Sequence, residues 1–423
     1  MSEQKSEWTR RTFLKVAGAG AAAAAGTGLA PSVVRGAAKD PIVLGCQADL
    51  TGGFASWGYW LEKAARAAVE RVNREGGIAG RPVKYVVEDT ESNPATGTRK
   101  MRRLIQREGA DFLIGTVHSG VMLASTPIAQ ELKTVYWPIA MASEATAEKG
   151  NRYVFRASSH VREQVQASSK WAVDNIAKKW TICVSDYAWG WSHRDWFKKE
   201  VEAAGGTIVT AMAIPQGTKD FVPFVSKIPG DTEAIYYVFF GADTLGFLQQ
   251  LHEIGYKGKK FSPVCTLEAV DLEKLGAAVE GAWALEYLPR RLRYKDTQSH
   301  REFRKLVAVD EEGREVGNPT RVIAGSHYWS TWESIHLIKR AVETSGWKSK
   351  TDTPALIQAL EGMKVSEGPE FPQGDLFLRA EDHQGFHQHW MSRIEKGKLE
   401  VKFTVPVERV VYAPPVDYRK EKV

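Results

Sequence analysis

The pattern of apolar and polar positions over residues 42–92 predicts a strand, a helix and a second strand. The first strand spans the largely apolar run 42–50 and stops at a Gly-rich turn, TGGF. Apolar or small side chains then recur at the spacing of one helix face, at Leu61, Ala64, Ala65, Ala68, Val69 and Val72. A glycine of the pair Gly76-Gly77 can take the left-handed conformation that ends a helix, and a second strand is predicted over 83–87. If the two strands are parallel in one sheet, the unit should wind right-handedly.

The loop TGGFASWG follows the first of these strands and is the first candidate for a binding loop. In open parallel sheets, ligands bind at the carboxyl ends of the strands. The helix behind the loop offers free N–H groups and the positive end of its dipole, which suit a carboxylate or a similar anion. The pattern therefore predicts an anion-binding loop over residues 51–58.

The alternation of strand-like and helix-like segments continues along the rest of the chain. Further strands are predicted at 112–115, 134–140, 180–185, 207–214, 234–240 and 260–265. Helices are predicted at 164–177, 193–204, 245–254 and 330–344. This order indicates an α/β fold with doubly wound parallel sheets. About 385 residues follow the first 38, which exceeds the size of one ordinary domain.

Several motifs in the first hundred residues resemble those of a known family. LTG lies near the end of the first strand, NREGGIAGRPV at the far end of the first helix, and Asn93-Pro94 after a second strand that ends in acidic residues. Together they resemble the periplasmic binding proteins of branched-chain amino acid ABC importers, and the order of motifs continues over residues 40–405. The resemblance implies a type I periplasmic binding protein, in which two lobes, each a doubly wound parallel sheet, are joined by three hinge crossovers. It also implies a protein that captures a small carboxylate-bearing ligand, an amino acid or an aromatic acid, and delivers it to a permease in the inner membrane.

The resemblance also implies where the lobes begin and end. Lobe one would take residues 40–157 and 288–367, lobe two 158–287 and 368–405, and a C-terminal tail 406–423. The crossovers would lie near Arg156-Ala157, Tyr287-Leu288 and Gly368-Pro369. The ligand is then expected to lie between the lobes and to hold them closed.

The N-terminal segment, residues 1–38, is similar to a twin-arginine export signal. Arg10-Arg11 precede a weakly apolar, Gly/Ala-rich run that ends near Gly36-Ala37-Ala38. This run is too short and too rich in Gly and Ala to span a bilayer stably. We therefore expect export to the periplasm; the alternative is a basic tail.

Net charge does not favour a nucleic-acid partner. The formal charge is +6, and residues 1–38 hold five basic and two acidic side chains, which leaves about +3 for the rest. The remaining Lys and Arg residues are scattered, whereas a nucleic-acid interface usually needs a clustered basic face. We expect a monomer with a small-molecule ligand and no nucleic-acid partner.

Three cysteines, Cys46, Cys183 and Cys265, lie in or beside apolar strand-like runs, and none forms a CxxC pair. An odd number cannot be fully paired within one chain, and a protein that folds in the cytoplasm before export would keep buried free thiols. Val43-Leu44-Gly45-Cys46 imitates a lipoprotein cleavage box, but cleavage there would remove most of the first strand, so we interpret it as a coincidence.

Three loops of lobe one are expected to face the ligand. Trp57 matches a position that is often aromatic in the family and would stack on the ligand. Ser119, in GTVHSGV, matches a family serine whose hydroxyl and N–H bind a ligand carboxylate at a helix start. In AMASEAT, Ala142 and Ser143 would offer a carbonyl and a hydroxyl, with the register of this loop open by one residue.

Three loops of lobe two complete the predicted site. Trp189, in SDYAWGWS, would close over the ligand from the opposite lobe, and Tyr187 is a candidate wall for which packing in the core or on the surface is the favoured alternative. Asp243 would take a ligand ammonium or hydroxyl; the alternative is that it caps the helix 245–254. Glu268, in CTLEAVD, is a second candidate for an ammonium.

Other chemistries have weaker support in the sequence. In the segment that holds His383, His387 and His389, the last two would lie on one face of a strand and could ligate a metal with Asp382, but the family often carries an acidic–His–Gln triplet here without one, so we predict no metal and no cofactor. There is no GxGxxG after the first strand, no Walker A loop and no GxSxG elbow, and we expect no enzyme activity. A periplasmic sensor that signals to a membrane receptor, and a Tat-exported oxidoreductase, remain as alternatives.

Overall fold

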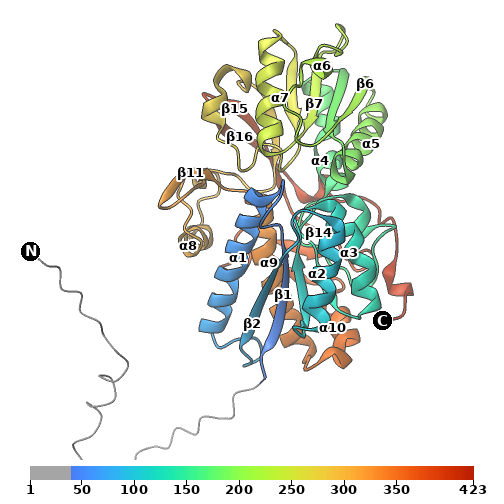
Figure 1. Cartoon of the computed structure of the whole chain (residues 1–423), viewed down its shortest axis with the longest axis vertical. Helices are drawn as coiled ribbons and strands as arrows, with labels where there is room; N and C mark the ends of the chain where they lie inside the picture. The colour runs from blue at the N-terminus through green and yellow to red at the C-terminus, as the bar shows by residue number, and fades with distance from the viewer. Residues whose placement is uncertain (1–39) are drawn as a thin grey trace, which may run out of the picture. The chain divides into compact units, whose positions relative to one another are not determined.

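The computed structural model describes residues 40–423 (Figure 1). The predicted export signal, residues 1–38, lies outside the described residues. Two principal β-sheets are present in the described part of the chain, one of four strands and one of seven. Both are parallel over most of their width and are packed against helices, which confirms the predicted α/β class.

The four-stranded sheet has the strand order β2-β1-β3-β4 and is entirely parallel. Its strands are β1 (Ile42–Ala48), β2 (Val83–Asp89), β3 (Phe112–Gly115) and β4 (Val135–Trp137). In register, Ile42 pairs with Val83 and Leu44 with Phe112, so the predicted parallel pairing of the first two strands is confirmed. After β2 is added on one side of β1, β3 and β4 are added on the other side, so the strand order reverses between β1 and β3. Ligands bind at such a switch point in open parallel sheets.

Two pairs of helices pack on this sheet. Helix α1 (Ala55–Arg74) packs against α9 (Gly325–Ser345), and α2 (Pro94–Gln106) packs against α3 (Ser119–Glu131). The α1 face that the sequence predicted is buried, as are the indoles of Trp57 and Trp60. After α1, Gly77 has φ +81°, and a Cβ there would lie 2.0 Å from the Arg81 carbonyl oxygen, so the turn requires glycine.

The seven-stranded sheet has the order β16-β15-β9-β8-β7-β5-β6. Its strands are β5 (Lys179–Ser185), β6 (Thr207–Ile214), β7 (Ala234–Val238), β8 (Lys259–Ser262), β9 (Trp283–Glu286), β15 (His389–Glu395) and β16 (Lys398–Val405). Strands β5 to β9 are parallel, and β15 and β16 add an antiparallel pair at one edge. The accompanying helices are α4 (Val161–Asn175), α5 (Ala188–Ala203), the short α6 (Val222–Val225) and α7 (Gly241–Glu253).

The remaining elements are short. They are α8 (Gln298–Leu306), α10 (Thr353–Leu360), the hairpin β10 (Arg314–Glu315) and β11 (Asn318–Val322), and the antiparallel strands β12 (Lys364–Val365), β13 (Leu376–Leu378) and β14 (Gly385–Phe386). Short 3-10 turns lie at Ser143–Thr146, Leu272–Ala278, Leu292–Tyr294, Lys350–Asp352, Val407–Arg409 and Tyr418–Lys420. In residues 40–423, no helix is both long enough and apolar enough to cross a membrane.

Several strands are shorter than predicted, for local reasons. β1 stops at Ala48 because the N–H groups of Leu50 and Thr51 donate to Asp89 Oδ1 (3.0 and 3.2 Å) instead of continuing the ladder. β4 stops before Pro138 and β8 before Pro263, since proline has no N–H to donate to a neighbouring strand.

The predicted lobe boundaries stay a prediction. The strand pairing indicates where the third crossover between the two sheets could lie. Residues 364–386 form β12 to β14 outside the seven-stranded sheet, which the chain joins only at His389 with β15. This pairing favours a third crossover just before His389 over one at Gly368-Pro369. At the first predicted crossover, Arg156 forms an isolated parallel bridge with Gln384, so two of the connecting segments lie side by side.

Candidate functional site

The strand-end loops of both sheets surround a small cavity, whose empty volume of about 200 Å³ includes space that is open to solvent. It is lined by Phe54, Val117, Ser119, Met141, Tyr187, Trp189, Cys265 and His327. These residues follow β1, β3 and β4 of one sheet and β5 and β8 of the other, with His327 from the first turn of α9. The cavity therefore lies between the carboxyl ends of the two sheets, where the fold predicts a ligand.

Phe54 is the aromatic side chain that the first loop brings to the cavity. Its ring stacks on Phe240 and meets the edge of His118 (centroids 4.2 and 4.9 Å apart). Trp57 also lies close by, with its ring 5.8 Å from Phe240, but it is only 1 % exposed and does not line the cavity. The residue predicted from this loop was Trp57, one helical turn further on, rather than Phe54.

Ser119 lies in the cavity wall at the position that the sequence predicted. It is the first residue of α3, and its Oγ accepts a hydrogen bond from the Ala142 N–H (3.2 Å). Among the described residues, no acceptor is found for its hydroxyl hydrogen, so that hydrogen can be donated to a ligand. The adjacent helix N-terminus favours an anionic partner.

Asp49 holds the loop that carries Ser119 and was not among the predicted residues. Its carboxylate accepts hydrogen bonds from the Val117 N–H (2.7 Å) and from the hydroxyls of Thr116 and Thr90 (2.5 Å each). Burial raises the pKa of Asp49, and the three donors act in the opposite direction. Asp49 is fully buried. The sequence signal that could have indicated its loop-holding role is an acid directly after an apolar strand, in ADLTGG.

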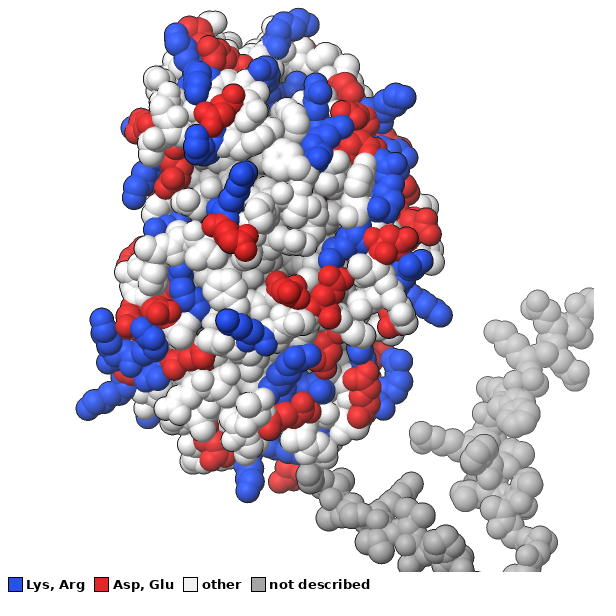
Figure 2. Space-filling model, turned by 180° about the vertical axis from the view of Figure 1, so that it is seen from behind, with Lys and Arg blue, Asp and Glu red and all other residues white. Residues whose placement is uncertain are grey.

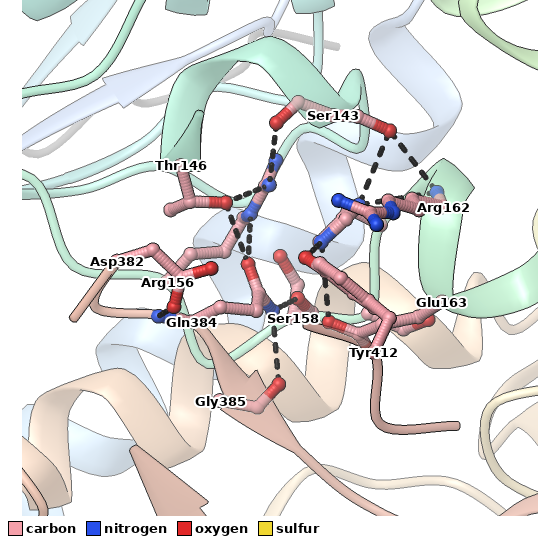
Figure 3. Close-up of polar contacts among 12 residues, drawn as sticks. Ser143, Thr146, Arg156, Ser158, Arg162, Glu163, Asp382, Gln384, Gly385 and Tyr412 are labelled. Atoms are coloured by element: carbon pink, nitrogen blue, oxygen red, sulfur yellow. Dashed lines mark hydrogen bonds and ion pairs between the residues drawn. The ribbon is translucent and has the colours of Figure 1, made fainter. Parts of the chain in front are cut away.

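Ala142 and Ser143 lie behind the cavity lining, in a buried polar network around Arg156 (Figure 3). The Ala142 carbonyl accepts a hydrogen bond from Arg156 Nη1 (2.7 Å). Ser143 Oγ accepts one from the Arg162 N–H (3.0 Å) and lies 3.3 Å from the hydroxyl of Ser192 in α5. Both groups that the sequence assigned to the ligand therefore have partners within the protein, and only their neighbour Met141 lines the cavity.

Arg156 is a fully buried cation that fixes this loop. Its guanidinium also donates to Gln384 Oε1 (2.8 Å), the Ala140 carbonyl (3.2 Å) and the Thr146 hydroxyl. Burial lowers the pKa of Arg156 and raises that of Glu163, and each charge partly offsets the effect on the other. The network therefore links the loop behind the cavity to the connecting segment at Gln384.

Trp189 and Tyr187 line the opposite wall. The sequence predicted this position for Trp189, whereas for Tyr187 it favoured packing in the core or on the surface. Trp189 is the second residue of α5 and packs edge-on against His193 (5.1 Å). The Tyr187 ring lies 5.7 Å from Phe54, which brings the two sets of loops into contact.

Asp243 and Glu268 do not line the cavity. Asp243 Oδ2 accepts a hydrogen bond from the Gly217 N–H (2.9 Å), and the helix cap residue of α7 is Phe240. Both carboxylate oxygens of Glu268 accept from the Ser326 N–H (3.1 Å each) at the start of α9. Among the described residues that line the cavity, none is an Asp or Glu.

The histidines considered for a metal have other partners. His383 Nδ1 lies 3.1 Å from the Val154 carbonyl oxygen, His387 Nε2 lies 3.1 Å from that of Ala157, and His389 Nε2 lies 2.7 Å from the Ser159 hydroxyl. Burial lowers the pKa of His387 to about 3 and that of His389 to about 4, so both are neutral. Hydrogen bonds within the protein therefore explain why these histidines are buried, without a bound metal.

The surface charges are mixed in sign. Figure 2 shows basic and acidic side chains interspersed over one face of the molecule, with an uncharged area across its middle. All three cysteines in residues 40–423 are buried and unpaired, which confirms the prediction of buried free thiols.

Sequence comparison identifies a family and similar proteins that agree with the observed fold. The periplasmic binding protein family matches residues 41–398. A Leu/Ile/Val-binding protein homologue of Brucella suis is 27 % identical over 335 residues, which cover 77 % of this chain and 81 % of that protein.

Solved structures share the fold. An ABC-transporter solute-binding protein of Rhodopseudomonas palustris, in complex with p-hydroxybenzoic acid, is 26 % identical with a TM-score of 0.76, and the match covers 87 % of this chain and 98 % of the other. The branched-chain amino acid transporter substrate-binding protein of Streptococcus pneumoniae, in complex with isoleucine, is 19 % identical with a TM-score of 0.71, covering 87 % and 99 %. The predicted type I periplasmic binding protein fold is thereby confirmed.

The similar proteins are solute-binding proteins, which as a class are not enzymes. The match to the family spans most of the chain, and the cavity lies where the fold places a solute. This chain therefore belongs to the periplasmic binding protein family.

Proposed function

We propose that this protein captures one small carboxylate-bearing solute between its two lobes and delivers it to an ABC permease in the inner membrane. The observation that carries the proposal is Ser119: its hydroxyl hydrogen has no acceptor among the described residues, and it lies at a helix N-terminus in the wall of the cavity. A carboxylate in the cavity would accept that hydrogen and interact favourably with the helix dipole. The protein would act as a monomer, without cofactor and without turning the solute over.

The lining of the cavity favours an aromatic acid over an α-amino acid. Phe54, Tyr187 and Trp189 offer ring faces and edges, and aromatic groups pack well against one another. No Asp or Glu is among the described residues that line the cavity, and the nearby Glu268 already accepts hydrogen bonds from the Ser326 N–H and hydroxyl, so it is not free for an α-ammonium. The relative in complex with p-hydroxybenzoic acid supports the same solute class.

Calorimetric titration of the purified mature protein tests this function. Benzoate and 4-hydroxybenzoate should bind one per chain, while benzamide, which has the same shape but no charge, should bind much more weakly. Isoleucine and phenylalanine should bind more weakly than the aromatic acids. Equal affinity for benzoate and benzamide would argue against recognition of a carboxylate, and formation of a product on long incubation would indicate an enzyme.

Ser119→Ala is the matching variant. It should weaken binding of the aromatic acid by about 1.5–3 kcal/mol, the range for hydrogen bonds to charged groups. Ser125→Ala, in the same helix, is the control, since Ser125 accepts a hydrogen bond from Gln47 and does not line the cavity. An unchanged affinity in Ser119→Ala would contradict the proposed role of its hydroxyl.

A further inference from the structure

Cys265, Glu268 and His327 bring three potential metal ligands together beside the solute cavity. One donor atom of each residue lies within 4.8 Å of the other two. Cys265 and His327 line the cavity, with exposed fractions of 7 % and 2 %, and the Glu268 side chain is 17 % exposed. A thiolate, an imidazole and a carboxylate are the three kinds of protein donor found in zinc sites.

Ser326 links two of these residues and sets which nitrogen of His327 is free. Its hydroxyl donates to Glu268 Oε2 (2.6 Å), so it can only accept from His327 Nδ1 (3.0 Å). That bond places the imidazole hydrogen on Nδ1 and leaves the lone pair on Nε2. Among the described residues, no hydrogen bond uses Nε2. Metal-binding histidines are typically held in this way, by a hydrogen bond from the ring nitrogen that does not bind the metal.

The backbone holds Cys265 in an uncommon conformation. Its φ is +81°, a region that residues other than glycine seldom adopt. Strain of this kind is found most often at functional sites, where the surrounding structure maintains it.

We propose that Cys265, Glu268 and His327 bind a Zn²⁺ ion at the edge of the solute cavity. Binding would replace the thiol proton of Cys265, which passes to solvent, and form bonds from Zn²⁺ to Sγ, to a carboxylate oxygen and to Nε2. His327 Nδ1 lies 4.0 Å from Glu268 Oε2, so the imidazole has to turn to present Nε2, and the three side chains have to approach to the roughly 3.5 Å at which tetrahedral zinc places its donors. A water would complete the coordination.

The position of this site in the fold gives the ion a second effect. Cys265 and Glu268 follow β8 of the seven-stranded sheet, whereas His327 lies in α9, which packs against α1 and the four-stranded sheet. A bound ion would therefore join elements that pack on the two sheets. Because it binds the native arrangement and not the unfolded chain, it should raise the melting temperature.

Cobalt provides the direct test, because Co²⁺ replaces Zn²⁺ and shows a thiolate-to-metal charge-transfer band in the near ultraviolet. The tag-free mature protein is treated with EDTA, dialysed and titrated with Co²⁺ alone, without solute. One Co²⁺ per chain and a thiolate band that Zn²⁺ abolishes are expected. Cys265→Ser should lose the band, while Cys183→Ser, which removes a buried thiol in β5, should keep it.

Two further measurements make the outcome independent of how well one variant folds. Ser326→Ala should reduce Zn²⁺ affinity about 10- to 100-fold, the usual effect of losing a group that orients a ligand. X-ray absorption at the zinc edge of the unaltered protein should show one sulfur with nitrogen or oxygen neighbours. A coordination shell without sulfur, or no thiolate band in the unaltered protein, would overturn the proposal. Since these readouts need no solute, they stand apart from the outcome of the benzoate titrations.

Discussion

The ring of Phe54 stacks on the ring of Phe240, with centroids 4.2 Å and planes 24° apart. Phe54 precedes α1 at the end of the four-stranded sheet, and Phe240 precedes α7 at the end of the seven-stranded sheet. The pair therefore joins the two sets of loops beside the cavity that Phe54 lines. An aromatic pair contributes about 0.5–1.5 kcal/mol beyond its buried area, so this contact stabilises the arrangement in which both sets of loops meet.

Substitutions at Phe54 and Trp57 should separate binding from stability. Phe54→Ala removes a ring from the cavity wall and should weaken binding of 4-hydroxybenzoate by about 1.5–3 kcal/mol, the scale for a large apolar side chain. Trp57→Ala empties a position that is 1 % exposed and should lower the unfolding free energy by about 3–5 kcal/mol. Calorimetry and thermal unfolding of the two variants measure the two effects.

The opposite result would support the prediction from the sequence that Trp57 stacks on the ligand. If Trp57→Ala folded normally and lost affinity while Phe54→Ala bound as the unaltered protein does, the tryptophan would be the stacking residue. Trp189→Ala serves as the positive control, because Trp189 lines the cavity on the opposite side. It should lose affinity in either case.

Strands and helices with a clear period were predictable from the sequence alone. The predicted segments 112–115 and 207–214 coincide with β3 and β6. The strand-end loops were predictable too, because a parallel sheet places them at one edge. The structure brings Ser119 and Trp189 to one cavity, as predicted.

Side-chain partners far apart in the sequence were not predictable. The Ala142 carbonyl was assigned to a ligand because nothing near it in the chain shows that Arg156 donates to it. Glu268 was assigned to an ammonium, although its partner is the Ser326 N–H, 58 residues away. Polar groups in strand-end loops can bind a ligand or one another, and only the packing of the whole chain decides between the two.

Replacing Arg156 should destabilise the whole protein. Arg156→Met would leave the Ala140 and Ala142 carbonyls buried without this donor, and each such loss costs about 1–3 kcal/mol. We expect the unfolding free energy to fall by at least about 3 kcal/mol, measured by denaturant titration. Arg102→Met is the control, since its ion pair with Glu131 is exposed to solvent and contributes little to stability. A similar small effect in both variants would show that the network around Arg156 is not needed for stability.

Acidification should reveal the buried neutral state of His389. Burial lowers its pKa to about 4, below the value near 6.5 of an unfolded chain. Between pH 6.5 and 4 the unfolded state therefore binds more protons than the native state, and stability is lost as the pH falls through this range. A shift of this size corresponds to at most about 3 kcal/mol.

The measurement compares unfolding free energies at pH 7.5 and pH 4.5. His389→Gln keeps a polar side chain and should lose less stability on acidification than the unaltered protein does. His252→Gln, on the surface in the last turn of α7, is the matched control. Equal losses in His389→Gln and the unaltered protein would mean that His389 does not contribute to this pH dependence.

Export should depend on the arginine pair at the start of the chain. Arg10 and Arg11 precede a weakly apolar, Gly/Ala-rich run, and the twin-arginine route carries proteins that have already folded. Three buried, unpaired thiols in residues 40–423 are consistent with folding in a reducing compartment. Changing both residues to Lys should therefore leave the precursor in the cytoplasm, as cell fractionation and immunoblotting would show. Arg35→Lys makes the same change outside the pair and should leave export intact; normal processing of the double variant would contradict the prediction.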